Sequence, residues 1–272
     1  MTSQPLDRDS KPPFLKPFLA LTALGLPGVF SLFPLAQQQL AAVDPEAVGL
    51  PVELLVIAAL AQTALLVVIA VAIVLATGPK VGFVSLIVER VRGGASVWRR
   101  LRPQAQLAIA LGLVTGGAIL MLDAVFLPMS GVDPEAFETA ALDPITQLIL
   151  GLLYGGITEE LLMRWGLMSL FAWLGWRLLA LRTRDGLPYA GLVWFAIVAT
   201  AVLFGVGHLP ALAAAVPLTP VLVARTIVLN ALGGLVFGWL FWRRSLEAAM
   251  VSHASVHVAF ALWRLISEVL GG

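Results

Sequence analysis

Two adjacent glutamates and an arginine, Glu159, Glu160 and Arg164, stand in the middle of a segment that is otherwise almost entirely apolar. Between residues 145 and 181 the only other polar side chains are those of Thr146, Gln147, Tyr154, Thr158, Ser169 and Arg177. An ionised side chain at such a place in a membrane helix costs several kcal/mol unless it is paired or kept for a function. These three residues are therefore the first candidates for chemistry.

The spacing of the three charges separates their roles. Glu160 and Arg164 are four residues apart with the glutamate on the N-terminal side, which is the favourable order for an ion pair within one helix. Glu159 lies about 100° around the helix from Glu160, so Arg164 does not neutralise it. We expect Glu160 and Arg164 to form a supporting pair and Glu159 to be available as a general base. The alternative is that Glu159 only hydrogen-bonds a neighbouring helix.

All three histidines of the chain, His208, His253 and His257, lie in late apolar segments. His253 and His257 are four residues apart and share one helix face. With Glu159 the histidines have the ligand types for zinc, although the chain has no HExxH arrangement. Neutral imidazoles can equally donate to a developing oxyanion, or serve only in helix packing. Because lipid cannot satisfy ionisable groups, we expect them to converge on one cavity.

The composition is that of an integral membrane protein. The 272 residues are 60% hydrophobic and only 12% charged, whereas soluble domains are about one quarter charged. The chain has no cysteine, which excludes disulfides, thiolate metal sites and a cysteine nucleophile. The net charge is +1 and no basic block indicates a nucleic-acid partner, so the expected environment is the lipid bilayer.

Apolar segments of spanning length follow one another along the chain, at about 14–35, 51–77, 104–127, 145–181, 189–208, 221–242 and 246–270. A kink is expected at 25–28, and the connection 209–218 has the composition to dip into the membrane. We therefore predict an all-α polytopic fold with about seven to eight transmembrane helices around a polar intramembrane cavity. Residues 1–13 should be a disordered tail, and 14–272 a single embedded domain.

Basic residues alternate between the ends of these segments, at 8–16, 80–102, 177–184 and 243–244. This bias predicts a cytoplasmic N-terminus and an external C-terminus. Part of segment 80–102 is amphipathic, which favours a helix lying at the membrane interface.

Three polar motifs occur in order along the second half of the chain: Glu159-Glu160-x-x-x-Arg164, Phe204-x-x-x-His208 and His253-x-x-x-His257. Their order and separation resemble the CAAX protease and bacteriocin-processing (CPBP, or Abi) family of intramembrane proteases, which includes the type II CAAX prenyl endopeptidases. The resemblance covers about residues 145–260. It implies an all-helical membrane fold in which the motif residues face one cavity.

The resemblance also implies the role of each residue. Glu159 would activate a water molecule together with His208, His253 and His257 would stabilise the oxyanion, and Glu160 with Arg164 would support the site. The implied function is an intramembrane endopeptidase that hydrolyses a peptide bond of a membrane-associated or lipidated peptide or protein. No cofactor is expected, with a zinc-dependent protease using the same residues as the alternative.

Two positions depart from the family pattern. Many members carry asparagine where this chain has His257, and some carry asparagine four residues after the second-motif histidine, where this chain has Leu212. Members without proteolytic activity also exist, so a non-proteolytic immunity or scaffold protein is the alternative outside enzymes. The expected location is the plasma (inner) membrane of a prokaryote.

Overall fold

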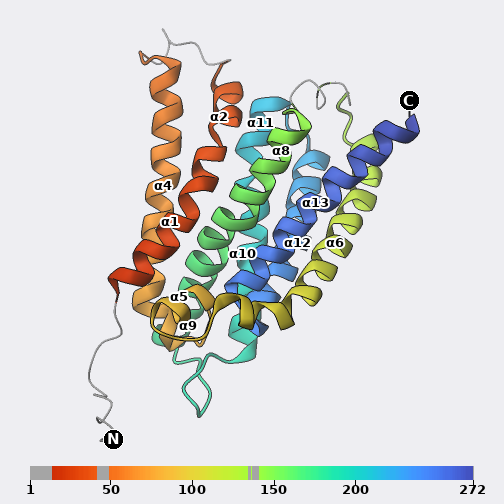
Figure 1. The fold of residues 1–272 in the computed structure, drawn as a ribbon. Coiled ribbons are helices and arrows are strands. Elements are labelled where there is room, and N and C mark those ends of the chain that lie inside the picture. Colours follow the sequence, from red (N-terminus) through yellow and green to blue (C-terminus); the bar gives the residue numbers. More distant parts are fainter. Residues whose placement is uncertain (1–13, 42–48, 134–135, 137–140, 272) are drawn as a thin grey trace, which may run out of the picture.

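The protein is a bundle of long helices in its computed structural model, which describes residues 14–41, 49–133, 136 and 141–271 (Figure 1). Within these ranges the only β-type pairing is an isolated bridge between Arg182 and Pro188. The predicted tail, 1–13, lies outside the described residues. That residues 14–272 form a single embedded domain stays a prediction.

Six described helical spans are long and apolar enough to cross a membrane: Val52–Thr77 (α4), Val97–Met129 (α6), Pro144–Leu178 (α8 to α9), Ala190–Ala215 (α10 and α11), Pro220–Arg243 (α12) and Leu246–Leu270, within α13 (Leu246–Gly271). The bent pair of α1 (Leu15–Ser31) and α2 (Phe33–Leu40) makes a seventh if it is counted as one span. The prediction of an all-α polytopic membrane protein is confirmed, with seven as the upper count for the described residues.

Two helix breaks differ in position from those expected. The first helix runs unbroken through residues 25–28, with Pro27 in its interior, and the 42° bend lies between Ser31 and Phe33. The fifth span does not end at His208. Instead α10 (Ala190–Gly207) gives way at His208 to α11 (Leu209–Ala215), and Pro210, which has no N–H to donate, lies in the first turn of α11. His208 therefore lies inside a span.

The span that carries the glutamates is not a regular α-helix. It consists of α8 (Pro144–Leu150), two π-helical stretches, η2 (Gly151–Glu159) and η3 (Leu161–Met168), and α9 (Ser169–Leu178). A π-helix bonds each residue to the fifth along and is frequent at functional sites. Thr158 fixes this span to α1 by donating its hydroxyl to the Gly25 carbonyl, at 2.8 Å.

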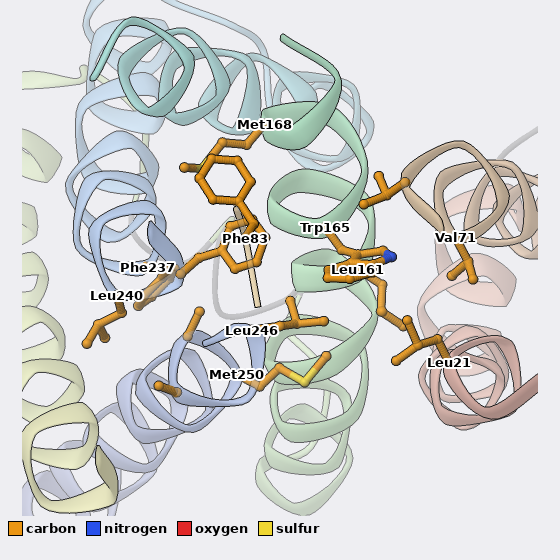
Figure 2. Close-up of a cluster of buried hydrophobic side chains, with 14 of the residues drawn as sticks. Leu21, Val71, Phe83, Leu161, Trp165, Met168, Phe237, Leu240, Leu246 and Met250 are labelled. Atoms are coloured by element: carbon orange, nitrogen blue, oxygen red, sulfur yellow. The ribbon is translucent and has the colours of Figure 1, made fainter. Parts of the chain in front are cut away.

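The core is an apolar cluster on both sides of η3 (Figure 2). Leu161 and Trp165 lie between η3 and the helices that carry Val71 (α4) and Leu21 (α1). On the opposite side, Phe237 of α12 and Leu246 and Met250 of α13 cover the same stretch. The stretch that follows the glutamates is therefore packed between helices on two opposite sides.

Small residues let α6 approach α13 very closely. Gly112 and Gly116 are four residues apart on α6 and face α13, where a β-carbon on Gly112 would overlap the Ser252 carbonyl and one on Gly116 would lie 2.7 Å from the Ala259 β-carbon. Ala108, one turn earlier, is fully buried. Stripes of small residues at this spacing are how membrane helices gain van der Waals contact. This contact fixes the position of the helix that carries two of the histidines.

We predict that Gly112→Ala lowers the free energy of unfolding by about 1–3 kcal/mol, the usual cost of forcing extra atoms into a packed interface. Gly117→Ala is the matched control on the same helix, because a β-carbon there meets no atom within 4 Å. The control should be neutral or stabilising by up to about 1 kcal/mol, since alanine is the better helix former. Thermal unfolding in detergent measures both, and equal destabilisation by the two changes would contradict the close contact.

Candidate active site

The structure brings Glu159, His208 and His253 together from three separate elements. The Glu159 Oε1 lies 3.8 Å from the His208 Nε2, and its Oε2 lies 3.8 Å from the His253 Nε2. Glu159 ends η2, His208 sits at the break between α10 and α11, and His253 lies in the second turn of α13. The expected convergence of the ionisable groups is therefore seen at these three residues.

Glu160 is completely buried and has two partners. Its Oε1 lies 3.2 Å from the Arg164 Nη1, so the predicted ion pair is confirmed. The same oxygen also lies 2.9 Å from the His253 Nδ1. The pair is therefore not confined to one helix, because Glu160 ties the π-helical span to α13.

The Arg164 guanidinium is enclosed by aromatic rings. Its central carbon lies 5.0 Å from the ring centre of Phe204 and 5.2 Å from that of Phe237, distances suited to cation–π attraction. A β-carbon on Gly234 would lie 3.4 Å from the Arg164 Nη2, so this glycine leaves the room that the guanidinium occupies. Rings and carboxylate together offset the cost of burying the cation.

Hydrogen bonds define which nitrogen of each histidine faces Glu159. The His208 Nδ1 lies 2.7 Å from the carbonyl oxygen of Phe204, which can only accept, so Nδ1 carries the proton. The His253 Nδ1 faces the Glu160 carboxylate in the same way. In both rings Nε2 is then the nitrogen directed at Glu159.

His257 lies behind His253 rather than beside Glu159. The two imidazole rings are stacked with centres 5.2 Å apart, and Phe260 packs edge-on against the far ring. Glycines make the space: β-carbons on Gly151 and Gly155 would both overlap the His257 ring. This use of Gly151 and Gly155 was missed from the sequence, although their spacing of four residues was a usable signal.

Burial differs across the cluster. The Glu160, Arg164 and His253 side chains are at most 6% exposed, whereas Glu159 is 13% and His208 36% exposed. Any substrate that enters therefore meets Glu159 and His208 first, and the buried pair supports them from behind.

A second buried glutamate, not singled out from the sequence, fixes the start of α13. The Glu247 carboxylate accepts from the Ser85 hydroxyl at 2.7 Å and from the Leu86 and Ile87 amides at 2.9 and 3.0 Å. It thereby caps α5 (Leu86–Val91), the short helix in the segment predicted to lie at the membrane interface. Glu247 precedes His253 by six residues on the same helix. Its hydrogen bonds therefore connect α5 directly to the helix that carries His253.

Glu247→Ala should lower the apparent unfolding temperature by several degrees, because a buried hydroxyl and two amides lose a charged acceptor at about 1 kcal/mol or more each. Glu268→Ala is the matched control, since Glu268 lies on the same helix but pairs with Arg264 at the surface. That control should change stability by less than about 1 kcal/mol. A thermal shift for Glu247→Ala no larger than the control's would refute the bracing role.

A metal ion is not supported by the positions of these side chains. Within the described ranges, no three histidine, aspartate or glutamate side chains are placed so that they could hold one ion.

The buried ion pair gives a further prediction. Arg164→Met should lower the free energy of unfolding by about 3–5 kcal/mol, because it leaves the Glu160 charge buried without its cation. Adding Glu160→Gln removes that charge and keeps an acceptor for His253, so the double variant should be more stable than Arg164→Met alone. Thermal unfolding of the three proteins tests this, and a double variant that is less stable than Arg164→Met would contradict it.

Fold and site define an integral membrane protein with a carboxylate and two imidazoles gathered between its helices. Residues 141–259 match the family model described as Type II CAAX prenyl endopeptidase Rce1-like, and this match supports the resemblance to the CPBP family of CAAX proteases. The matched segment contains all six predicted site residues, Glu159, Glu160, Arg164, His208, His253 and His257. No curated protein and no solved structure matches the chain.

Proposed function

We propose that the protein is an intramembrane endopeptidase that hydrolyses a peptide bond of a membrane-associated or lipidated protein. The observation that carries the proposal is the approach of the Glu159 carboxylate to the Nε2 atoms of both His208 and His253. The match of residues 141–259 to a family model of endopeptidases supports the reaction class. The basic residues at alternate span ends favour a cytoplasmic N-terminus. The proposed location is the plasma membrane of a prokaryote.

Glu159 is the proposed general base. A water molecule held between Glu159 and the His208 Nε2 attacks the scissile carbonyl carbon, and Glu159 takes its proton as the new C–O bond forms. The carbonyl oxygen becomes an oxyanion. When the tetrahedral intermediate collapses, the C–N bond breaks and Glu159 returns the proton to the departing amine, which leaves an acid and an amine as products.

His253 is the proposed oxyanion donor, and its contact with Glu160 sets a condition on that role. Because Nδ1 already donates to Glu160, Nε2 can donate to an oxyanion only when the ring holds a proton on each nitrogen. The Glu160 carboxylate lies 2.9 Å from that Nδ1 and holds the ring with Nε2 toward Glu159. Glu160 therefore supports the reaction through His253, and His257 supports it by stacking behind the same ring.

Glu159→Gln and His208→Ala should each lower the cleavage rate by about 10²-fold or more, the usual contribution of a positioned proton-transfer group. Both should leave the unfolding temperature near that of the wild type. Glu53→Gln, an exposed glutamate in the first turn of α4, is the matched control and should keep full activity. The assay uses protein reconstituted in liposomes and a panel of prenylated and unprenylated membrane-anchored peptides, with products identified by mass spectrometry.

Three measurements separate this mechanism from the alternatives. Normal turnover by Glu159→Gln would end the general-base mechanism. Stoichiometric zinc in the purified protein, lost together with activity on chelation, would favour the zinc-dependent protease. A cellular phenotype that survives the Glu159→Gln/His208→Ala double change would favour an immunity or scaffold role.

A further inference from the structure

A cavity of about 140 Å³ lies at the end of the bundle where α4 finishes and α6 begins. Its walls come from the end of α4, the residues that lead into α5, part of α5 itself, and one residue of η3. The walls include Val74, Leu75, Phe83, Val88, Arg92 and Trp165. α4 and α6 are both long and apolar enough to cross a membrane, and the basic segment with α5 joins them at this end of the bundle (Figure 1). We therefore infer that the cavity lies at the membrane boundary.

The cavity combines apolar walls with a cation that has no counter-ion. Among the described residues no hydrogen bond or ion pair reaches the Arg92 side chain, and its Nε is shielded from solvent. Glu89, the acidic residue of the wall, is already paired with Arg100. Trp165 is only 4% exposed, and its indole N–H also has no acceptor in the described part of the chain. Two residues that line this cavity, Arg92 and Trp165, thus each have a buried nitrogen donor without an acceptor in the described part of the chain.

We propose that this cavity binds the phosphodiester headgroup of an anionic phospholipid. A planar guanidinium with free donors matches phosphate oxygens, and a partly buried site strengthens that bond. The apolar walls suit the glycerol and the first carbons of an acyl chain. The bilayer supplies this ligand at the level of the membrane surface, where the cavity lies. Basic side chains next to membrane spans attract anionic lipid. The neighbouring Trp98 is exposed, as tryptophans at the membrane interface are.

A ligand in this cavity would contact residues that connect to two parts of the candidate site, the start of α13 and η3. Val84 and Ser85 line the cavity, and they bond to Leu246 (backbone, 2.9 Å) and to Glu247 at the start of the helix that carries His253. Trp165 lines it too and adjoins Arg164, the partner of Glu160. Bound lipid should therefore stabilise the folded protein, whether or not it is a protease.

The test measures the unfolding temperature of the full chain in detergent while short-chain phosphatidylglycerol or phosphatidylcholine is added. We expect a saturable rise with phosphatidylglycerol and not with phosphatidylcholine, and retention of the former in native mass spectrometry. Arg92→Gln should weaken the apparent affinity about tenfold, as the loss of one charge-assisted hydrogen bond implies. Arg99→Gln removes the same charge from an exposed neighbour and should weaken it less than about twofold.

Val88→Phe fills the cavity without changing charge and should also abolish the response, which keeps the test valid if Arg92→Gln folds poorly. Equal responses to the two lipids, an unchanged response in Arg92→Gln, or an equal loss in Arg99→Gln would overturn the proposal. Inorganic phosphate and glycerol phosphate are added separately. If either compound at millimolar concentration raised the unfolding temperature, and if this effect depended on Arg92, the ligand would be a soluble phosphate or phosphate ester and not a lipid.

Discussion

A carboxylate with no access to water is the constraint on which the rest of the site depends. Glu160 is fully buried in a helix surrounded by apolar side chains, where an isolated charge would cost several kcal/mol. It is tolerated because Arg164 supplies a cation from its own helix and His253 a donor from another. Satisfying Glu160 therefore also fixes the His253 ring with Nε2 toward Glu159. A stability requirement and the geometry of the candidate site are met by one contact.

The surrounding elements make that contact hold. The π-helical stretch and its glycines bring α13 close enough for the His253 and His257 rings to lie against the backbone of the glutamate span. Gly112 and Gly116 seat α13 from the other side, and Glu247 fixes where it begins. A helix held at its start and along one face cannot turn His253 away from Glu160 without breaking several buried contacts at once.

Much of this could be predicted from the sequence, because the relevant signals are either local spacings or follow from the exclusion of ionisable side chains from lipid. The Glu160–Arg164 pair follows from spacing within one helix, and the meeting of Glu159 with the histidines follows from the lack of any other place for them in lipid. The His253–Glu160 bond could not be predicted, since it depends on how two helices are rotated about their axes. Nor could the role of Glu247, because a glutamate near a helix start usually faces solvent. The π-helical geometry has no sequence period that could be detected. The span that contains His208 was predicted to end there because a proline such as Pro210 usually follows the end of a helix.

The most direct test is the protonation of the three histidine rings, read by ¹⁵N NMR on histidine-labelled protein in bilayers. With only three histidines, single substitutions assign every signal. The account predicts that His253 and His208 carry a proton on Nδ1, and that Glu160→Gln alters the His253 nitrogen signals while leaving those of His208 in place. A neutral His253 with its proton on Nε2 would mean that Glu160 does not accept from it, and would contradict the arrangement on which the proposed mechanism rests.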